Sequence, residues 1–90
     1  MGVIGLTGTL ICEPAEAEIV RAALPDHIRL SRAEPGCIAF DVTETAPGLF
    51  NVAERFADRA AFDTHQARTR ASHWWQATGH MTRDFTLSEE

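Results

Sequence analysis

His65 is the side chain of this 90-residue chain that is best suited to proton transfer. An imidazole titrates near neutral pH, so it can accept a proton from a phenol or orient one. His65 falls in a segment with helical spacing, on one stripe with Ala61 and Phe62. The ring can equally hydrogen-bond to a strand residue such as Glu54 and hold the helix to the sheet. The sequence leaves both roles open.

Glu54 and Asn51 are the other candidates for chemistry on a polar group. Glu54 alternates with Phe50, Val52 and Phe56 on one face of a predicted strand. A carboxylate on an apolar face needs a partner or a raised pKa, so Glu54 is a candidate base, with an ion pair or hydrogen bond to an Arg or His as the alternative. Asn51 faces the other way and can donate a hydrogen bond to a carbonyl or an oxyanion, or be an ordinary polar residue at an interface.

Two tryptophans and one arginine are candidates for contact with a ligand. Trp74 and Trp75 diverge by about 100° around a helix, so one can pack in a core while the other lines a cavity or a dimer contact. Arg83 alternates with Met81 and Phe85 on the last predicted strand. It can bind an anionic substrate group, polarise oxygen, or pair with an acid across a dimer.

Several classes of chemistry are excluded by what the sequence omits. It contains no lysine and no tyrosine, which excludes a lysine Schiff base, a P-loop lysine and a phenolic acid. Its four histidines and two cysteines have no metal-ligand spacing, so no metal is predicted. No dinucleotide fingerprint or Gly-x-Ser-x-Gly elbow occurs, and the expected cofactor is none.

Length and charge narrow the class of protein further. Ninety residues predict a single domain over 1–90. Thirteen acidic against eight basic residues give a net charge of −5, which disfavours nucleic acid and anionic membrane surfaces as partners. The chain has no apolar run of roughly 18 residues and no signal-peptide pattern, so we expect a cytoplasmic protein with reduced cysteines.

The apolar periodicity predicts four strands and three helical segments. The strands are expected at 3–12, 37–44, 49–56 and 80–87, with a hairpin loop at 46–48. A helical region begins at Pro14, and Pro25 is expected to kink it or split it into two helices, the second capped by Asp26. Further helices are expected at 59–66, with Asp58 as N-cap, and at 71–78, ended by Gly79.

The order β-α-β-β-α-β is that of a ferredoxin-like α+β sandwich. Such a fold packs its helices on one face of an antiparallel sheet. The uncovered face is expected to carry several apolar residues, and a chain this short buries only about two thirds of its surface alone. Both points favour a homodimer that closes sheet against sheet.

Three segments of the chain together resemble the antibiotic biosynthesis monooxygenase family. They are Gly36-Cys37-Ile38-Ala39-Phe40, the run from Glu54 to Phe62, and His65. The order is a glycine turn into a strand, an acid-x-aromatic strand end and a helix that carries a histidine. The resemblance implies a dimeric α+β barrel, in which many members oxidise phenols or quinols with O₂ and without metal or flavin. Others degrade haem, isomerise small molecules or have no known activity.

The sequence departs from the haem-degrading branch of that family. The resemblance places Trp75 where that branch has its histidine ligand and His65 where it has a tryptophan. The first strand offers no asparagine.

The prediction is therefore a dimeric, cofactor-independent monooxygenase for a small phenolic or quinol-like compound. His65, Asn51 and Glu54 are the predicted catalytic residues. The substrate pocket is expected between sheet and helices, and its predicted lining is Phe40, Phe50, Phe62, Trp74, Trp75 and Arg83. A dimeric binding or stress-response module without turnover, and an isomerase of small carbonyl compounds that uses the same pocket, are the alternatives.

Overall fold

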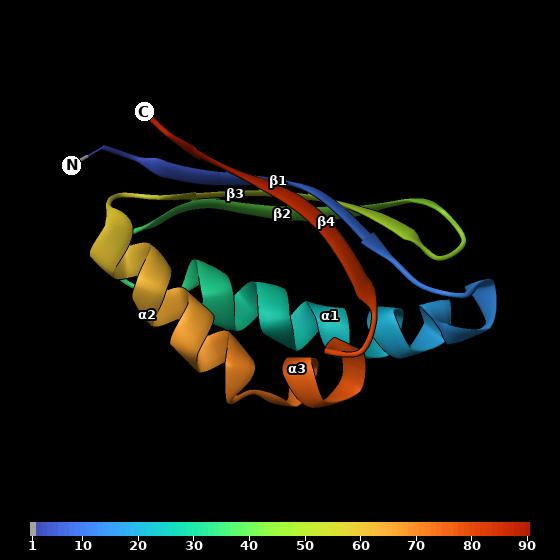
Figure 1. Cartoon of the computed structure of the whole chain (residues 1–90). Coiled ribbons are helices and arrows are strands. Elements are labelled where there is room, and N and C mark those ends of the chain that lie inside the picture. The colour runs from blue at the N-terminus through green and yellow to red at the C-terminus, as the bar shows by residue number, and fades with distance from the viewer. Residues whose placement is uncertain (1) are drawn as a thin grey trace.

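A four-stranded antiparallel sheet with helices against one face makes up the part of the chain that the computed structural model describes, residues 2–90. The strands lie in the order β2-β3-β1-β4, and the helices lie below the sheet in Figure 1. In chain order the elements are β1 (Ile4–Ile11), the 3-10 turn η1 (Pro14–Glu16), α1 (Ala17–Arg32), β2 (Cys37–Ala46), β3 (Leu49–Phe56), α2 (Arg59–Arg70), α3 (His73–Thr78) and β4 (Thr82–Glu89). The predicted ferredoxin-like α+β fold is confirmed.

The two central strands, β1 and β3, carry the apolar alternation that fixes the sheet. Leu6 and Leu10 of β1 are buried, and they pair with Glu54 and Phe50 of β3. Because the side-chain period of a strand is two, this register turns every second residue toward the helices. Burying a large apolar side chain of this kind contributes roughly 1.5–3 kcal/mol, and a one-residue slip would expose the whole set.

The first helix, α1, differs from the sequence prediction at its middle. Pro25 lies inside a single helix that runs from Ala17 to Arg32, so the two-helix alternative was wrong and Asp26 caps nothing. Proline removes one backbone hydrogen bond, but Val20, Ala23 and His27 are buried against the sheet on both sides of it. Packing of that face keeps the helix continuous.

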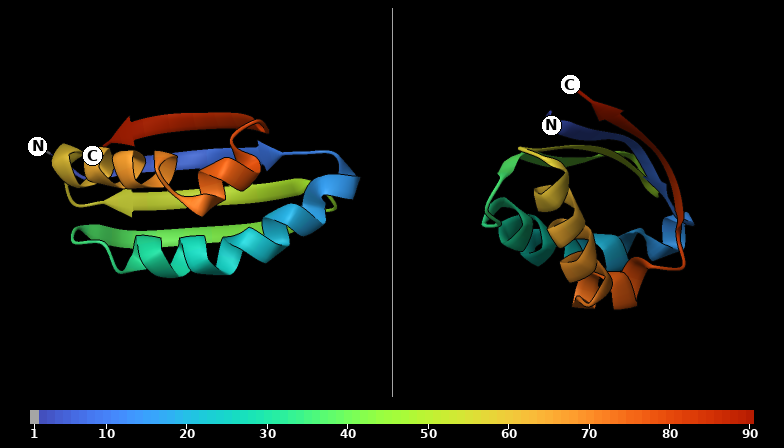
Figure 2. Two further views of the ribbon diagram at one scale, coloured as in Figure 1. Left: turned by 90° about the horizontal axis from the view of Figure 1, so that it is seen from below. Right: turned by 60° about the vertical axis from the view of Figure 1, so that its left-hand side comes forward.

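The second helix begins at its predicted cap, and the third begins at His73, two residues after the predicted start. The Asp58 carboxylate accepts a hydrogen bond from the Ala61 amide at 2.8 Å and starts α2, which continues to Arg70, four residues beyond the predicted end. The Ser72 hydroxyl caps α3, and Gly79 ends it as predicted. In Figure 2, α1 and α2 cross the same face of the sheet, and α3 leads from α2 back to β4.

The β2–β3 hairpin contains a turn and an irregularity. Gly48 occupies the turn with φ +83°, and a Cβ there would lie 2.3 Å from the Cys12 carbonyl oxygen, so only glycine fits. The register shifts between Cys37 and Ala39. The sequence predicts Ile38 on the same face as Phe40. Because of this irregularity Ile38 does not share the buried face, and it is 50% exposed.

The outer face of the sheet is less apolar than predicted. By register it carries mainly threonine, serine and alanine, with Ile11 and Leu49 as paired large apolar side chains at one end. The other large apolar residues of β1 and β3 face the helices instead. Within residues 2–90, no helix combines the length and hydropathy that crossing a bilayer requires.

The N-cap of α2 gives a direct test of these helix boundaries. We expect Asp58→Ala to lower the free energy of unfolding by about 1 kcal/mol, because it leaves the Ala61 amide without its acceptor. Asp26→Ala removes only an exposed contact to Arg29 inside α1 and should cost less than about 0.5 kcal/mol. Urea unfolding of the two variants measures the difference, and equal losses would contradict the assignment.

Candidate functional site

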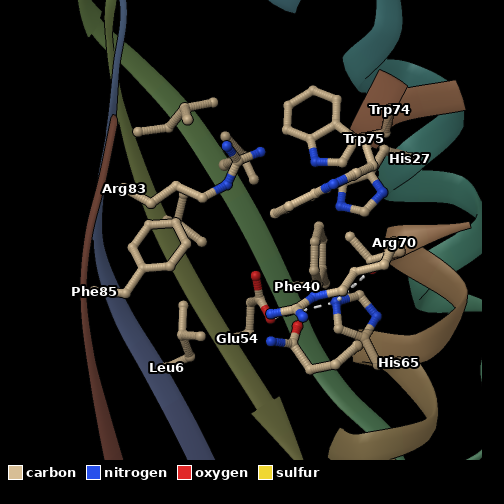
Figure 3. Close-up of a pocket in the computed structure, with 15 residues that line it drawn as sticks. Leu6, His27, Phe40, Glu54, His65, Arg70, Trp74, Trp75, Arg83 and Phe85 are labelled. Carbon is tan, nitrogen blue, oxygen red and sulfur yellow. Dashed lines mark hydrogen bonds and ion pairs between the residues drawn. The ribbon is translucent and has the colours of Figure 1, made fainter. Parts of the chain in front are cut away.

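A cavity of about 200 Å³ lies between the sheet and the helices. Figure 3 shows side chains from both layers converging on it. Its apolar wall is formed by Leu6, Leu10, Phe40, Val42, Val52 and Phe85. Its polar and aromatic wall is formed by His27, Glu54, His65, Gln66, Thr69, Arg70, Trp74, Trp75 and Arg83. An apolar cavity of roughly 150 Å³ accepts benzene, so this one is large enough for a single substituted ring.

Glu54 is the acid of this cavity. It is 7% exposed, and its Oε1 atom has no hydrogen-bond partner among the described residues 2–90. Burial raises the pKa of Glu54 to about 7, and the negative charge of Glu34 adds to the rise. Figure 3 shows the carboxyl group projecting from β3 into the space between the layers. A carboxyl group with this pKa exchanges a proton near neutral pH.

His65 lies beside Glu54 and is held by a second acid. Its Nδ1 is 2.7 Å from Oε1 of Glu34, and its Nε2 is 3.6 Å from Oε1 of Glu54. Because an ionised carboxylate only accepts hydrogen bonds, Nδ1 is the donor toward Glu34, which leaves Nε2 as the acceptor of the neutral ring. The Thr69 hydroxyl lies 3.4 Å from Nε2 and is the group that donates to it, while Glu54 lies slightly farther away on the same side of the ring.

The burial of His65 favours its neutral form, although the neighbouring acid Glu34 favours the charged form. The ring is 2% exposed and packs between Phe40 and Phe56, at 5.4 and 4.8 Å between centroids. Burial lowers the pKa of His65, and the hydrogen bond and charge of Glu34 partly offset that effect. Glu34 itself is paired with Arg68, which also donates to Ser31 at 2.9 Å.

His27 lines the same cavity from α1. Its ring is stacked on Trp74 with centroids 4.6 Å apart and an angle of 3° between planes. Burial lowers the pKa of His27 to about 3, and the positive charges of Arg68 and Arg83 and the interaction with the His65 ring act in the same direction. The ring is therefore neutral at physiological pH, and its Nδ1 has no hydrogen-bond partner within residues 2–90.

Arg83 occupies the side of the cavity formed by β4 and α3. It donates to the Thr78 carbonyl and hydroxyl oxygens, each at 2.8 Å, and to the Met81 carbonyl at 3.4 Å. Its guanidinium carbon lies 4.7 Å from the centroid of the Trp75 ring, and that of Arg70 lies 5.5 Å from it. Burial lowers the pKa of Arg83, which still remains a cation.

The structure brings most, but not all, of the predicted site residues to this cavity. His65, Glu54, Phe40, Trp74, Trp75 and Arg83 line it. Asn51 does not, because strand alternation places it on the outer face, opposite Thr9 and Thr43, and the prediction that it is a catalytic residue of this pocket is corrected. Phe50 and Phe62 are buried in the core beside the cavity rather than in its lining.

Sequence reasoning missed residues that reach the site through tertiary packing. His27, Gln66, Thr69 and Arg70 line the cavity, and Glu34 supports it from behind His65. The helical period of α2 gives a signal for Thr69, which lies one turn after His65. Across residues 2–90, no cluster of three or more His, Cys, Asp or Glu side chains has the geometry of a metal site.

Residues 4–77 match the family of antibiotic biosynthesis monooxygenases, and the chain belongs to this family. No curated protein is significantly similar to it. Among solved structures, it is similar to Rv0793 from Mycobacterium tuberculosis, with 26% identity, 98% of this chain and 94% of that chain covered, and a TM-score of 0.78.

Two further solved structures support the family fold. The protein SO0527 from Shewanella oneidensis is 26% identical, with 99% of this chain and 89% of that chain covered and a TM-score of 0.78. A Deinococcus radiodurans protein, provisionally described as an antibiotic biosynthesis monooxygenase, is 28% identical over 98% of this chain and 91% of that chain, with a TM-score of 0.76.

The buried acid makes stability depend on pH. The native pKa of Glu54, about 7, lies above the ordinary value of 4.5, so the native state keeps a proton that the unfolded chain releases. Stability from this group is present below the unfolded pKa and is lost as pH rises through the native pKa, by about 1.4 kcal/mol per pH unit within the window. We expect Glu54→Gln, which cannot ionise, to gain stability relative to wild type as pH rises.

Urea unfolding at several values from about pH 5 to about pH 8 measures this effect. The margin between Glu54→Gln and wild type should widen by about 2 kcal/mol or more across that range. Both proteins contain His27 and His65, so the contributions of those rings largely cancel in the comparison. Parallel stability curves would show that Glu54 titrates normally.

Proposed function

We propose that the protein is a cofactor-independent monooxygenase that oxidises a small phenolic or quinol-like compound with O₂. The observation that carries this proposal is a buried carboxyl group of raised pKa, beside a histidine and inside an aromatic cavity. Family membership and the similarity to the Deinococcus radiodurans protein support an oxygenase over other uses of the fold. Residues 1–90 would act as one domain in the cytoplasm, with Cys12 and Cys37 as free thiols.

The first step is removal of the phenolic proton. Glu54 is the proposed base, with Nε2 of His65 3.6 Å from its Oε1 atom, because a base with a pKa near 7 is well matched to work at neutral pH. Glu34 holds the ring so that Nε2 remains the acceptor. The substrate hydroxyl would therefore lie against Glu54, with its ring between Phe40 and the wall formed by Trp74 and Trp75.

The second step transfers electrons to oxygen. The phenolate is more electron-rich than the phenol, and it passes one electron to O₂ to give a radical pair. Recombination forms a carbon–oxygen bond at a ring carbon that carries hydrogen. The base returns the phenolic proton to the outer peroxide oxygen. Loss of the ring hydrogen as a second proton, with cleavage of the O–O bond, then releases water and leaves a quinone. One oxygen atom enters the product and the other enters water. The apolar wall limits access of bulk water to the intermediates.

A homodimer is the proposed assembly, closed through the outer face of the sheet. That face has no covering helix, and its small threonine, serine and alanine side chains allow close approach of a second sheet. Thr7 lies at the centre of this outer face, and its side chain is exposed.

Oxygen consumption tests the proposed activity. Metal-free protein should consume O₂ with a dihydroxyaromatic substrate, and Glu54→Gln or His65→Ala should slow turnover by at least about a hundredfold. Glu13→Gln and His73→Ala, at exposed positions outside the cavity, serve as matched controls. Circular dichroism establishes that each variant is folded. Unchanged turnover in both cavity variants would remove this pair from the mechanism.

The same assay under nitrogen separates the alternatives. Turnover of a small carbonyl compound without oxygen would indicate an isomerase that uses the same acid and histidine. Tight binding of an aromatic compound with no turnover in air or nitrogen would indicate a binding module.

Sedimentation equilibrium tests the assembly. Wild-type protein should sediment at twice the chain mass of 9.9 kDa. Thr7→Arg places a long cation at the centre of the outer face and should shift the protein to the mass of one chain. Thr64→Arg, at an exposed position on α2, should leave the dimer intact. A wild-type protein that sediments as one chain would rule out the proposed interface.

A further inference from the structure

The arginines of this chain fall into two groups. Six of the eight have an acidic partner: Arg21, Arg29, Arg32, Arg55, Arg59 and Arg68. Arg70 and Arg83 have none within residues 2–90, and these two are the arginines that line the cavity. The chain has thirteen acidic residues, so the lack of a partner at these positions is not due to a shortage of acids.

Arg83 is a partly buried cation without a counter-charge. Its contacts are the Thr78 carbonyl and hydroxyl oxygens, the Met81 carbonyl and the face of Trp75. Neutral oxygens and an aromatic face orient a guanidinium, but they leave its charge uncompensated. Removing a cation from water without pairing it with an anion costs free energy. The site therefore favours a ligand that carries an anionic group.

The remaining donors of Arg83 define the shape of that anion. Nη1 uses its two hydrogens on carbonyl oxygens, and Nη2 uses one of its two on the Thr78 hydroxyl. Two N–H groups, one on Nη2 and one on Nε, stay free out of five. Two donors suit the two oxygens of a carboxylate.

Arg70 adds a second cation near the same place. It extends from the last turn of α2, and its guanidinium lies against the Trp75 ring that Arg83 also contacts. Figure 3 shows Arg70 and Arg83 reaching toward the cavity from α2 and β4. Arg70 and Arg83 thus both lie against Trp75 at one side of the cavity, while Glu54 lies on β3 with its Oε1 atom unpaired within residues 2–90.

We propose that Arg70, Arg83 and Trp75 form a subsite for a carboxylate group, so that the substrate is an aromatic acid whose ring also carries a hydroxyl group. This inference rests on the proposed function for the role of the hydroxyl group, which faces Glu54, and it adds the class of substrate. The chain as a whole carries a net charge of −5, so anion binding needs such a local pair of cations.

Two probes of similar size test the subsite by calorimetric titration under nitrogen: 3,4-dihydroxybenzoate and 4-methylcatechol. Wild-type protein should bind the carboxylate at least about tenfold more tightly, and the preference should weaken as salt is added. Arg70→Gln should reduce the preference severalfold, and Arg70→Gln with Arg83→Gln should abolish it. Arg59→Gln, on the same helix but paired with Asp63, is the matched control and should keep it.

Arg70→Gln is informative even if Arg83→Gln does not fold, because Arg70 is exposed and makes no hydrogen bond within residues 2–90. Equal affinity of wild-type protein for the two probes, absence of measurable carboxylate binding, or a preference in Arg70→Gln as large as that of wild type would each overturn the subsite. Binding is measured without oxygen, so the titration reports affinity for the probe independently of any oxidation of it. A carboxylate preference without oxygen consumption would reject the oxygenase alone, and oxygen consumption with no such preference would reject the subsite alone.

Discussion

The burial of one carboxyl group on an apolar strand face is the constraint on which the site depends. Glu54 occupies an inward position of β3 that Val52 and Phe56 flank, and the register with β1 fixes that direction. Burial removes water from its charge, the negative charge of Glu34 adds to the effect, and the pKa rises toward neutrality. A carboxyl group that exchanges its proton near neutral pH beside His65 is the physical outcome, and proton transfer to or from a ligand is the chemistry that this makes available.

The rest of the fold supports that arrangement from three sides. The Asp58 cap starts α2 so that His65, two turns later, reaches the sheet beside Glu54. The turn after α1 brings Glu34 behind the ring, where its bond to Nδ1 sets the tautomer and Arg68 keeps the acid paired. β4 returns alongside β1 and carries Arg83 to the far wall. Each polar group is held by an element whose apolar face is buried.

Strand alternation and cap residues predicted much of this molecule. They placed β3 at its observed bounds, set Glu54 inward and Asn51 outward, and identified Asp58 as the start of a helix. Periodicity gave no signal for Glu34, which lies 31 residues from His65 in a proline-glycine turn and reaches it only through tertiary packing. The continuity of α1 through Pro25 also depended on packing, since the local preference of proline is to break a helix.

The proton site can be observed directly. Carbon-13 NMR of the side-chain carboxyl groups, recorded across pH with Glu54→Gln to assign the signal, reports the titration of Glu54 itself. We expect a midpoint near the value of about 7 that burial imposes. A midpoint at or below the ordinary value of 4.5 would mean that water or a cation reaches this carboxylate, and Glu54 would not exchange a proton near neutral pH.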